Sequence, residues 1–529
     1  MESMLGLLKR LFRGKKKKKN GEENVKQLKQ FSLSRDIQDN IRRLKDMMNN
    51  SYDIKSRIFE ISGSNTQGAI LYIDNLVNEN MLQDQILKPL LIESTSILEK
   101  TGEGVDFDRI RDSMISVGDV KEAETFDEIV LAVMSGDTFL CIQGYTKGLL
   151  ISARGYQGRT VGEPAIEPSV KGPQEAFVEI LKLNIGLIRR RYRDPNLCIE
   201  VYKLGRRTKA DTAVLYIKGI AHQNLVDEVK RRLTSIDIDI PSTATQLGHL
   251  LVDNPSSIFP LLQTTERPDK VVTALGEGRV ALLLEGSPDA IVVPVTLPIL
   301  MQSVDDYFDN WIAGSVIRIS RYVALFISTL FPALYIATTS VHPGMLPTNL
   351  ALSIAAARAG VPFPTLVEAV LMESTLELLQ EAGIRLPRVV GQTVSIVGGL
   401  VIGQAAVQAG VVSPIMVIVI SITAVASFTI PDYSLSMATR IVRVPFMILS
   451  VTFGSFGIAM GMLFLLSYLS DLKSFGIRYL EPITPYRIRD WKDTLIRAPQ
   501  WTMGKRPEFL SPEDTQRMKP SKRRKLNER

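Results

Sequence analysis

The chain has 529 residues, 45% of them hydrophobic, and carries 63 Lys plus Arg against 56 Asp plus Glu, a formal net charge of +7. This length predicts more than one domain. The positive charge is concentrated at the ends, with +7 in residues 1–19 and +5 in 505–529, which leaves about −5 for the rest. Because the excess lies in two tails rather than on one folded face, the pattern argues against nucleic-acid binding.

The scarcity of cysteine and histidine limits the chemistry. Cys141 and Cys198 stand alone, and the three histidines are isolated from one another, so neither a disulfide framework, a zinc site nor a Ser-His-Asp arrangement is indicated. Gly276-Glu-Gly278 precedes a predicted strand rather than a helix, which is the wrong order for a phosphate-binding loop. We therefore predict no catalytic residue, metal site or cofactor, and no enzymatic activity.

Residues 1–49 form a basic N-terminal tail. Their apolar run, Met4–Leu8, is shorter than the roughly 7 to 15 residues of a secretory signal. A short amphipathic helix ahead of Lys15–Lys19 could rest on anionic membrane lipid. A solvated tail is the alternative.

Residues 50–300 have the alternating strand and helix pattern of an α/β fold. The predicted strands are Ala69–Ile73, Phe139–Ile142, Ala213–Ile217 and Val280–Leu284, and the predicted helices include Gln174–Arg190 and Asn224–Leu233.

Two features of this region recur. The Ala-x-Leu-Tyr-Ile strands that begin at Ala69 and Ala213 are 144 residues apart. The G-x7-G frames Gly136–Gly144 and Gly278–Gly286, each enclosing a predicted strand, are 142 residues apart. Such agreement in spacing predicts an internal duplication.

We place the two similar subdomains at 50–173 and 174–300. They are joined through the loop Gly155–Pro173 and a long helix at 174–192. The basic run Arg189–Arg191, with Arg193, at the end of this helix is either a lipid or partner contact, or a solvated face that complements the helix C-terminus.

Beyond Trp311 the charge pattern predicts a polytopic, all-α membrane domain at 301–472. Charge is absent from 322–357, 389–431 and 444–470, which are 36, 43 and 27 residues long, whereas one helical span needs about 20. A turn at Gly410–Pro414 divides the longest stretch. The predicted spans are about 318–340, 390–409, 414–431 and 444–469.

Four spans place both ends of the chain on one side. Both tails are basic, so the positive-inside tendency predicts a cytoplasmic N-terminal domain and a cytoplasmic C-terminal tail at 473–529. Arg440 and Arg443 then fall near an external loop and are exceptions to this tendency. Gly457 and Gly461 form a GxxxG face suited to close helix contact.

The segment 349–383 between the first two spans differs from an ordinary loop. Asn349–Ala359 is an apolar helix too short to cross a bilayer, and Gly360-Val-Pro-Phe-Pro364 then breaks it. A second helix, Thr365–Ala382, ends at Gly383, which is a favourable left-handed cap.

This second helix places Glu373, Glu377 and Glu381 on one face. Carboxylates at membrane depth cost about 2.5 to 3.5 kcal/mol each on insertion scales, so they must face water. One interpretation is an interfacial hairpin with a solvated acidic face. The other is a re-entrant pore loop, which requires several subunits around one axis because four spans cannot enclose a pore alone.

In the pore interpretation, the break is the apolar constriction and the glutamates form an acidic vestibule. The candidate constriction residues are Gly360, Val361, Pro362, Phe363 and Pro364, and the candidate vestibule residues are Glu373, Glu377 and Glu381. A transporter is an alternative because broken helices also build substrate sites, although no inverted repeat is visible in the membrane half.

The chain resembles the A subunit of the Ger-type (GerA family) nutrient germinant receptors of bacterial spores. The stretches that carry the resemblance are Glu167-Pro-Ser-Val-Lys-Gly-Pro-Gln-Glu-Ala-Phe177, Arg189-Arg-Arg191, Thr265-Glu-Arg-Pro-Asp269, Glu285-Gly-Ser-Pro288, His342-Pro-Gly344, Gly360-Val-Pro-Phe-Pro-Thr365, Glu381-Ala-Gly383, Val394-Ser-Ile-Val-Gly398, Arg497-Ala-Pro499 and Lys505-Arg-Pro507. The family more often has Arg where this chain has Lys171 and Gln174.

The resemblance implies a multi-pass protein of the spore inner membrane. Its implied partners are a B subunit, which is similar to amino-acid permeases, and a C subunit, which is a lipoprotein. It also implies that A subunits form a homo-oligomer that releases monovalent cations when nutrient is sensed. A non-conducting scaffold or signalling subunit of the receptor is the alternative role.

Overall fold

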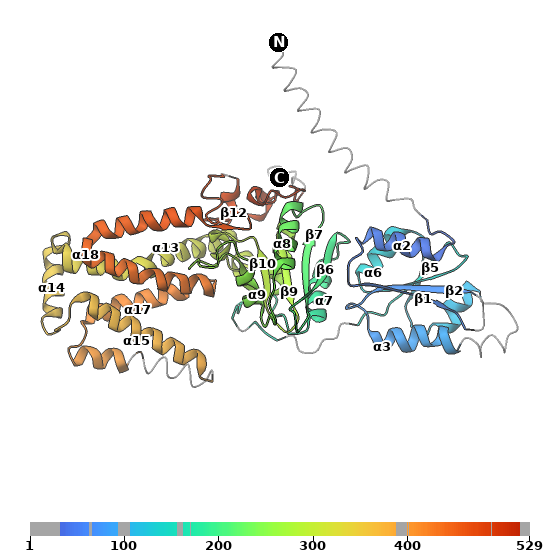
Figure 1. Cartoon of the computed structure of the whole chain (residues 1–529), viewed down its shortest axis with the longest axis horizontal. Coiled ribbons are helices and arrows are strands. Elements are labelled where there is room, and N and C mark those ends of the chain that lie inside the picture. Colours follow the sequence, from blue (N-terminus) through green and yellow to red (C-terminus); the bar gives the residue numbers. More distant parts are fainter. Residues whose placement is uncertain are drawn as a thin grey trace, which may run out of the picture. The chain divides into compact units, whose positions relative to one another are not determined.

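The computed structural model describes residues 32–62, 66–93, 106–155, 162–164, 166–169, 171–387, 399, 401–487 and 489–518. Residues 1–31 of the N-terminal tail, which include the amphipathic helix predicted ahead of Lys15–Lys19, and residues 519–529 of the C-terminal tail therefore lie outside the described residues. Contacts divide the chain into two compact units (Figure 1). The first, here called the α/β unit, contains residues up to 166, 174–247 and 264–291. The second, here called the helical unit, contains residues 167–173, 248–263 and 292 onward.

The first sheet of the α/β unit has five strands in the order β1-β2-β4-β5-β3. The strands are β1 Ile54–Glu60, β2 Gln67–Ile73, β3 Val120–Ala123, β4 Thr138–Ile142 and β5 Gly148–Ile151. The helices around them are α2 Ile37–Met47, α3 Glu79–Met81, α5 Phe107–Arg109 and α6 Phe126–Met134, with π-helical turns at Leu82–Leu87, Pro89–Glu93 and Ile110–Met114.

Alternating side chains bury both faces of this sheet. On β2, Ala69 and Leu71 join the buried cluster under α2 and α6, whereas Ile70 joins the cluster under the helical segments after α3. This is the two-residue period of a strand that is covered on both sides. Figure 1 shows α2 and α6 on one face of the sheet and α3 on the other.

The second sheet has the strand order β6-β7-β9-β10-β8. The strands are β6 Leu197–Leu204, β7 Ala210–Ile217, β8 Gln263–Thr265, β9 Val280–Leu284 and β10 Ala290–Val293. The helices around them are α7 Leu181–Arg191, α8 Gln223–Ser235, α9 Ala244–Leu251 and α10 Pro268–Glu277.

The two sheets therefore have the same strand order, and the repeated sequence features occupy equivalent places. The Ala-x-Leu-Tyr-Ile strands are β2 and β7, and the two G-x7-G frames enclose β4 and β9. All four frame glycines, Gly136, Gly144, Gly278 and Gly286, have positive φ between 84° and 101°. A side chain at these positions would be strained, which explains why both frames begin and end with glycine.

The helix expected over 174–192 is shorter than predicted. It begins only at Leu181, because the backbone before it is bound elsewhere. The N–H of Phe177 donates to the carbonyl of Glu266, and the side-chain amide of Asn184 both accepts from and donates to the backbone of Val178. The carboxylate of Glu285 then accepts from the N–H of Leu181 and caps the helix.

The basic run at the end of α7 forms ion pairs inside the α/β unit. Arg189 is fully buried and donates to both oxygens of Asp53, at 2.9 Å each, and to Ser51 Oγ. Arg190 and Arg191 both pair with Glu175. The expectation of either a lipid contact or a solvated face is therefore wrong for Arg189, whose charge fixes α7 to the start of β1.

The helical unit follows β10. Its helices are α11 Leu297–Leu300, α12 Asp305–Phe308, α13 Trp311–Ile336, α14 Thr348–Arg358, α15 Thr365–Arg385, α17 Pro414–Phe428 and α18 Tyr433–Asp471, and its short strands are β11 Lys473–Ser474 and β12 Ile477–Arg478. A π-helical turn at Ala337–Val341 and 3-10 turns at Pro343–Met345, Asp490–Asp493, Gln500–Thr502 and Glu508–Leu510 complete the unit.

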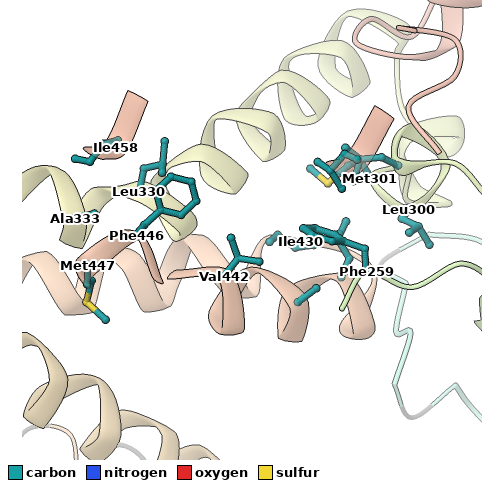
Figure 2. Close-up of a cluster of buried hydrophobic side chains, with 14 of the residues drawn as sticks. Phe259, Leu300, Met301, Leu330, Ala333, Ile430, Val442, Phe446, Met447 and Ile458 are labelled. Carbon is teal, nitrogen blue, oxygen red and sulfur yellow. The ribbon is translucent and has the colours of Figure 1, made fainter. Parts of the chain in front are cut away.

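One buried apolar cluster holds α13, α17 and α18 together. It includes Leu330 of α13, Phe446 of α18 and Ile458, which lies further along α18 (Figure 2). Met416 of α17 belongs to the same cluster. Phe259 and Leu300, from segments before α13, belong to the same cluster. The core of the helical unit is thus built from residues that lie far apart in the sequence, from Phe259 to Leu480.

Candidate functional site

The predicted helix–break–helix segment is present. The expected first helix, Asn349–Ala359, corresponds to α14, and the expected second helix begins at Thr365 as predicted. Gly383 does not end that helix, which continues to Arg385. Between α14 and α15, Gly360, Pro362, Phe363 and Pro364 are exposed and Val361 is half-buried.

A buried glutamate holds this break in place. Glu368, in the first turn of α15, is fully buried, and one of its oxygens is 3.2 Å from the guanidinium of Arg358 at the end of α14. Its other oxygen accepts from the N–H of Ser413 at 2.8 Å. Ser413 caps α17, and a Cβ on Gly410 in the same turn would lie 3.1 Å from the carbonyl oxygen of Gly360. Glu368 therefore fixes two helix-breaking turns against each other.

The three predicted vestibule glutamates are each ion-paired. Glu373 pairs with Arg443 of α18, Glu377 lies 3.5 Å from Arg440 of the same helix, and Glu381 pairs with Arg385 one turn further along α15. Glu377 and Glu381 are exposed, whereas the Glu373 side chain is only 14% exposed. The acidic face of α15 is thus compensated by arginines of the same chain.

The last apolar helix contains a sharp break. Gly454 has φ 62° and ψ −142°, which is not helical, and it divides α18 within the expected span 444–469. Beyond the break the chain folds back on itself. Gly457 closely approaches Leu449: a Cβ on Gly457 would lie only 2.2 Å from the carbonyl oxygen of Leu449. The predicted close contact at Gly457 and Gly461 is therefore made, with residues 446–449 of the same helix.

Three residues that matter here were not among the predicted site residues: Arg358, Glu368 and Arg443. Arg443 carried a usable signal, because it lies with Arg440 in a segment that is otherwise apolar. A charge in such a segment usually faces the protein interior and has a partner. The sequence pattern could not name that partner, since Glu373 lies 70 residues away.

By length and composition alone, two helices of the described part could cross a bilayer, Trp311–Val341 and Tyr433–Asp471. The second consists of two helical segments that meet at the Gly454 break. The expected spans 318–340 and 444–469 fall within the first and second of these helices, and the expected span 414–431 corresponds to the shorter apolar helix α17. Half of the expected span 390–409, residues 390–398 and 400, lies outside the described residues. The helical unit is therefore suited to membrane association.

Among the described residues, no group of three or more His, Cys, Asp or Glu side chains is placed to hold a metal ion. Cys141 and Cys198 are both buried and unpaired with each other. Burial raises the pKa of both thiols, that of Cys141 to about 12. A thiol held in its protonated form is a weak nucleophile and a weak metal ligand.

Fold and site together define a class of protein: an α/β part with two five-stranded sheets, followed by a helical part that carries membrane-length helices and a broken helix pair. The chain belongs to the Bacillus/Clostridium GerA spore germination protein family, whose model matches residues 42–509. This confirms the resemblance to Ger-type A subunits.

Several spore germination proteins are similar over most of their length. Spore germination protein B1 of Bacillus subtilis is 41% identical over 492 residues, 92% of this chain and all of that one. Spore germination protein KA of B. subtilis is 38% identical, covering 91% and 88% of the two chains. GerLA of Bacillus cereus is 36% identical, covering 90% and 96%.

A solved structure is also similar in sequence: the N-terminal domain of the A subunit of the Bacillus megaterium spore germinant receptor GerK3. It is 30% identical and covers 50% of this chain and 96% of that one, with a TM-score of 0.39.

Proposed function

We propose that this chain is the A subunit of a nutrient germinant receptor and that several copies form a nutrient-gated path for monovalent cations. The observation that carries the proposal is the pair α14 and α15. The exposed break between them, Gly360–Pro364, lies in a helical unit with a large buried apolar core. Such a break is stable at membrane depth only beside water or protein.

In this proposal the helical unit is a four-span membrane domain with 349–383 as its re-entrant segment. The α/β part is a duplicated domain that lies, like the C-terminal tail, on the cytoplasmic side of the spore inner membrane. The helix Trp311–Val341 and the apolar composition of Tyr433–Asp471 support the placement. The permease-like B subunit and the lipoprotein C subunit are its partners.

Oligomerisation is supported by the outer face of α15. Val367, Val370, Leu371 and Leu378 are all exposed in the single chain. Val367, Val370 and Leu371 share one face of the helix at i, i+3 and i+4 spacing, and Leu378 follows two turns further along the same side. In the assembled receptor this stripe packs against neighbouring copies or lipid, while Val361 and Phe363 point to the constriction and Glu373, Glu377 and Glu381 lie at its mouth.

The test is ion release from spores that carry the receptor with altered constriction residues. Val361→Ala and Phe363→Ala widen the constriction and are expected to change the rate of monovalent-cation release several-fold. Cysteine placed at position 361 should make release sensitive to a thiol reagent, and the buried native thiols leave that cysteine as the reactive target. If both alanine variants and the triple Glu→Gln variant release ions at the parental rate, the path lies elsewhere.

A second candidate, a non-conducting signalling subunit, is favoured by one observation. Each proposed vestibule glutamate is paired with an arginine of the same chain, which removes free negative charge from the mouth. A purified A subunit that remains a monomer by mass, in a receptor that still triggers germination, would support this candidate over the channel.

A further inference from the structure

Helix α13 contains a hydrogen-bonding defect. Pro332 lies in its interior and has no N–H, so the carbonyl of Ser328, four residues earlier, loses its normal partner in the helix. Arg443 of α18 supplies the missing donor, because its Nε donates to this carbonyl at 2.6 Å. A guanidinium from one helix thus completes the hydrogen bonding of another.

The other arm of the same guanidinium reaches a third helix. Arg443 Nη1 donates to a carboxylate oxygen of Glu373 on α15. The Arg443 side chain is only 1% exposed, and its neighbours along α18, Val442, Phe446 and Met447, belong to the buried apolar cluster (Figure 2). A charge in such surroundings is costly without its partner. Arg443 therefore joins α13, α15 and α18 through one side chain.

The neighbouring pair provides an internal comparison. Arg440, nearly one turn earlier on α18, lies 3.5 Å from Glu377, whose side chain is 48% exposed. The guanidinium of Arg440 also lies over the ring of Phe428, 5.9 Å from its centroid. This pair is looser and more solvated than the Arg443 pair, so screening by water weakens it.

We propose that Arg443 is a positioning residue that holds α15, and with it the break at 360–364, against α13. It does so by a two-armed contact that Pro332 makes possible. The inference rests on the proposed function only in that α15 borders the ion path. A lysine cannot replace Arg443, because an ammonium lacks the rigid fork that serves two acceptors at once.

The rate of disulfide cross-linking between α15 and the end of α13 measures the position of α15 independently of ion flux. Ser340, after α13, donates to Thr365 at the start of α15 with 3.0 Å between the hydroxyl oxygens. A full-length receptor with Ser340→Cys and Thr365→Cys is expected to form a disulfide when oxidised in its membrane. The native cysteines are buried and do not compete.

Arg443→Gln and Glu373→Gln should each slow this cross-linking at least five-fold, while Arg440→Gln and Glu377→Gln leave its rate unchanged. If Arg443→Gln fails to accumulate, Glu373→Gln carries the test, because it keeps the Arg443–Ser328 contact. Parental cross-linking rates in a folded Arg443→Gln or Glu373→Gln receptor would overturn the proposal.

A charge swap separates the two-armed contact from a simple ion pair. In Glu373→Arg/Arg443→Glu, the new carboxylate cannot donate to the Ser328 carbonyl, so the swap alone should not restore cross-linking. Adding Pro332→Ala returns an N–H to α13, and the triple variant should then recover. Full rescue by the swap alone would overturn the role of Ser328.

The two proposals fail separately. Slower cross-linking in Arg443→Gln together with parental ion release in the constriction variants would retain the positioning role and reject the ion path. Altered release in the constriction variants together with unchanged cross-linking would do the reverse.

Discussion

At the residue scale, several arginines of this protein are buried and act through specific acceptors. Arg189 in the α/β unit and Arg318 and Arg443 in the helical unit are nearly inaccessible to solvent. Each donates to both a carboxylate and a backbone carbonyl. The planar guanidinium suits such sites because it presents several donors in a fixed geometry.

Because the Asp53–Arg189 pair is buried, we expect a large loss of folding stability when one partner is removed. Asp53→Asn leaves the buried charge of Arg189 without its counter-charge, which should destabilise the protein by about 3–5 kcal/mol. Asp39→Asn, which breaks an exposed pair with Arg43 on α2, is the control and should cost less than about 1 kcal/mol. Thermal unfolding of the two variants measures the difference, and equal losses would contradict it.

The surroundings of Glu200 lead us to expect that folding stability depends on pH. Partial burial raises its pKa, but hydrogen bonds from Lys230, Tyr216 and Tyr202 outweigh this and hold the pKa below its ordinary value of 4.5. The ionised group therefore stabilises the fold above pH 4.5, and this contribution is lost as the pH falls through the lowered pKa.

Glu200→Gln should accordingly unfold at a lower temperature than the parent at pH 7, and the difference should shrink as the pH falls below 4.5. Glu60→Gln, at an exposed position on β1, is the control and should show no such trend. Unfolding midpoints measured from pH 7 to 3 provide the test. A difference that is constant over this range would contradict the assignment.

At the element scale, breaks in the helices determine the shape of the helical unit. Gly454 interrupts α18 in a backbone conformation that residues other than glycine rarely adopt, and His342 packs directly against it. The uncharged composition of 444–470 predicted one continuous span. Composition indicates that a segment prefers apolar surroundings, but it does not indicate where the chain changes direction. The fold-back depends on one φ/ψ pair.

Gly454→Ala should therefore destabilise the protein by about 1–3 kcal/mol, since the alanine would be strained in this conformation. Its Cβ would also lie 2.3 Å from Nε2 of His342. Gly344→Ala is the matched control, because a Cβ there has no atom within 4 Å. Thermal unfolding in detergent compares the two, and a Gly454→Ala protein as stable as the parent would show that the break is not required.

At the scale of the whole molecule, the C-terminal segment returns to the start of the first membrane-length helix. Arg318 of α13 donates to the carbonyl and carboxylate of Asp493 at 2.8 and 2.7 Å. Arg497 donates to the carbonyls of Asp309 and Tyr307. The Arg497-Ala-Pro499 motif therefore contacts the segment just before α13, which lies 188 to 190 residues earlier in the chain.

A chain that ends at residue 489 loses both Asp493 and Arg497 and leaves the buried Arg318 with only Asp306 as a counter-charge. We expect faster protease cleavage between α12 and α13 and less protein in the membrane. A chain that ends at residue 518 keeps these contacts and serves as the control. Equal cleavage rates in the two shortened chains would contradict this role.

The sequence by itself determined the features that depend on local pattern: the strands with short apolar runs, the repeated Gly frames, the break at Gly360–Pro364 and the family. These follow from backbone preferences and from motifs that nearby residues encode. Only the tertiary structure decided which charges meet, such as Glu373 with Arg443, where α7 begins, and where α18 folds back. These features depend on the relative energies of contacts between residues far apart in the chain. A local sequence pattern carries no information about those energies.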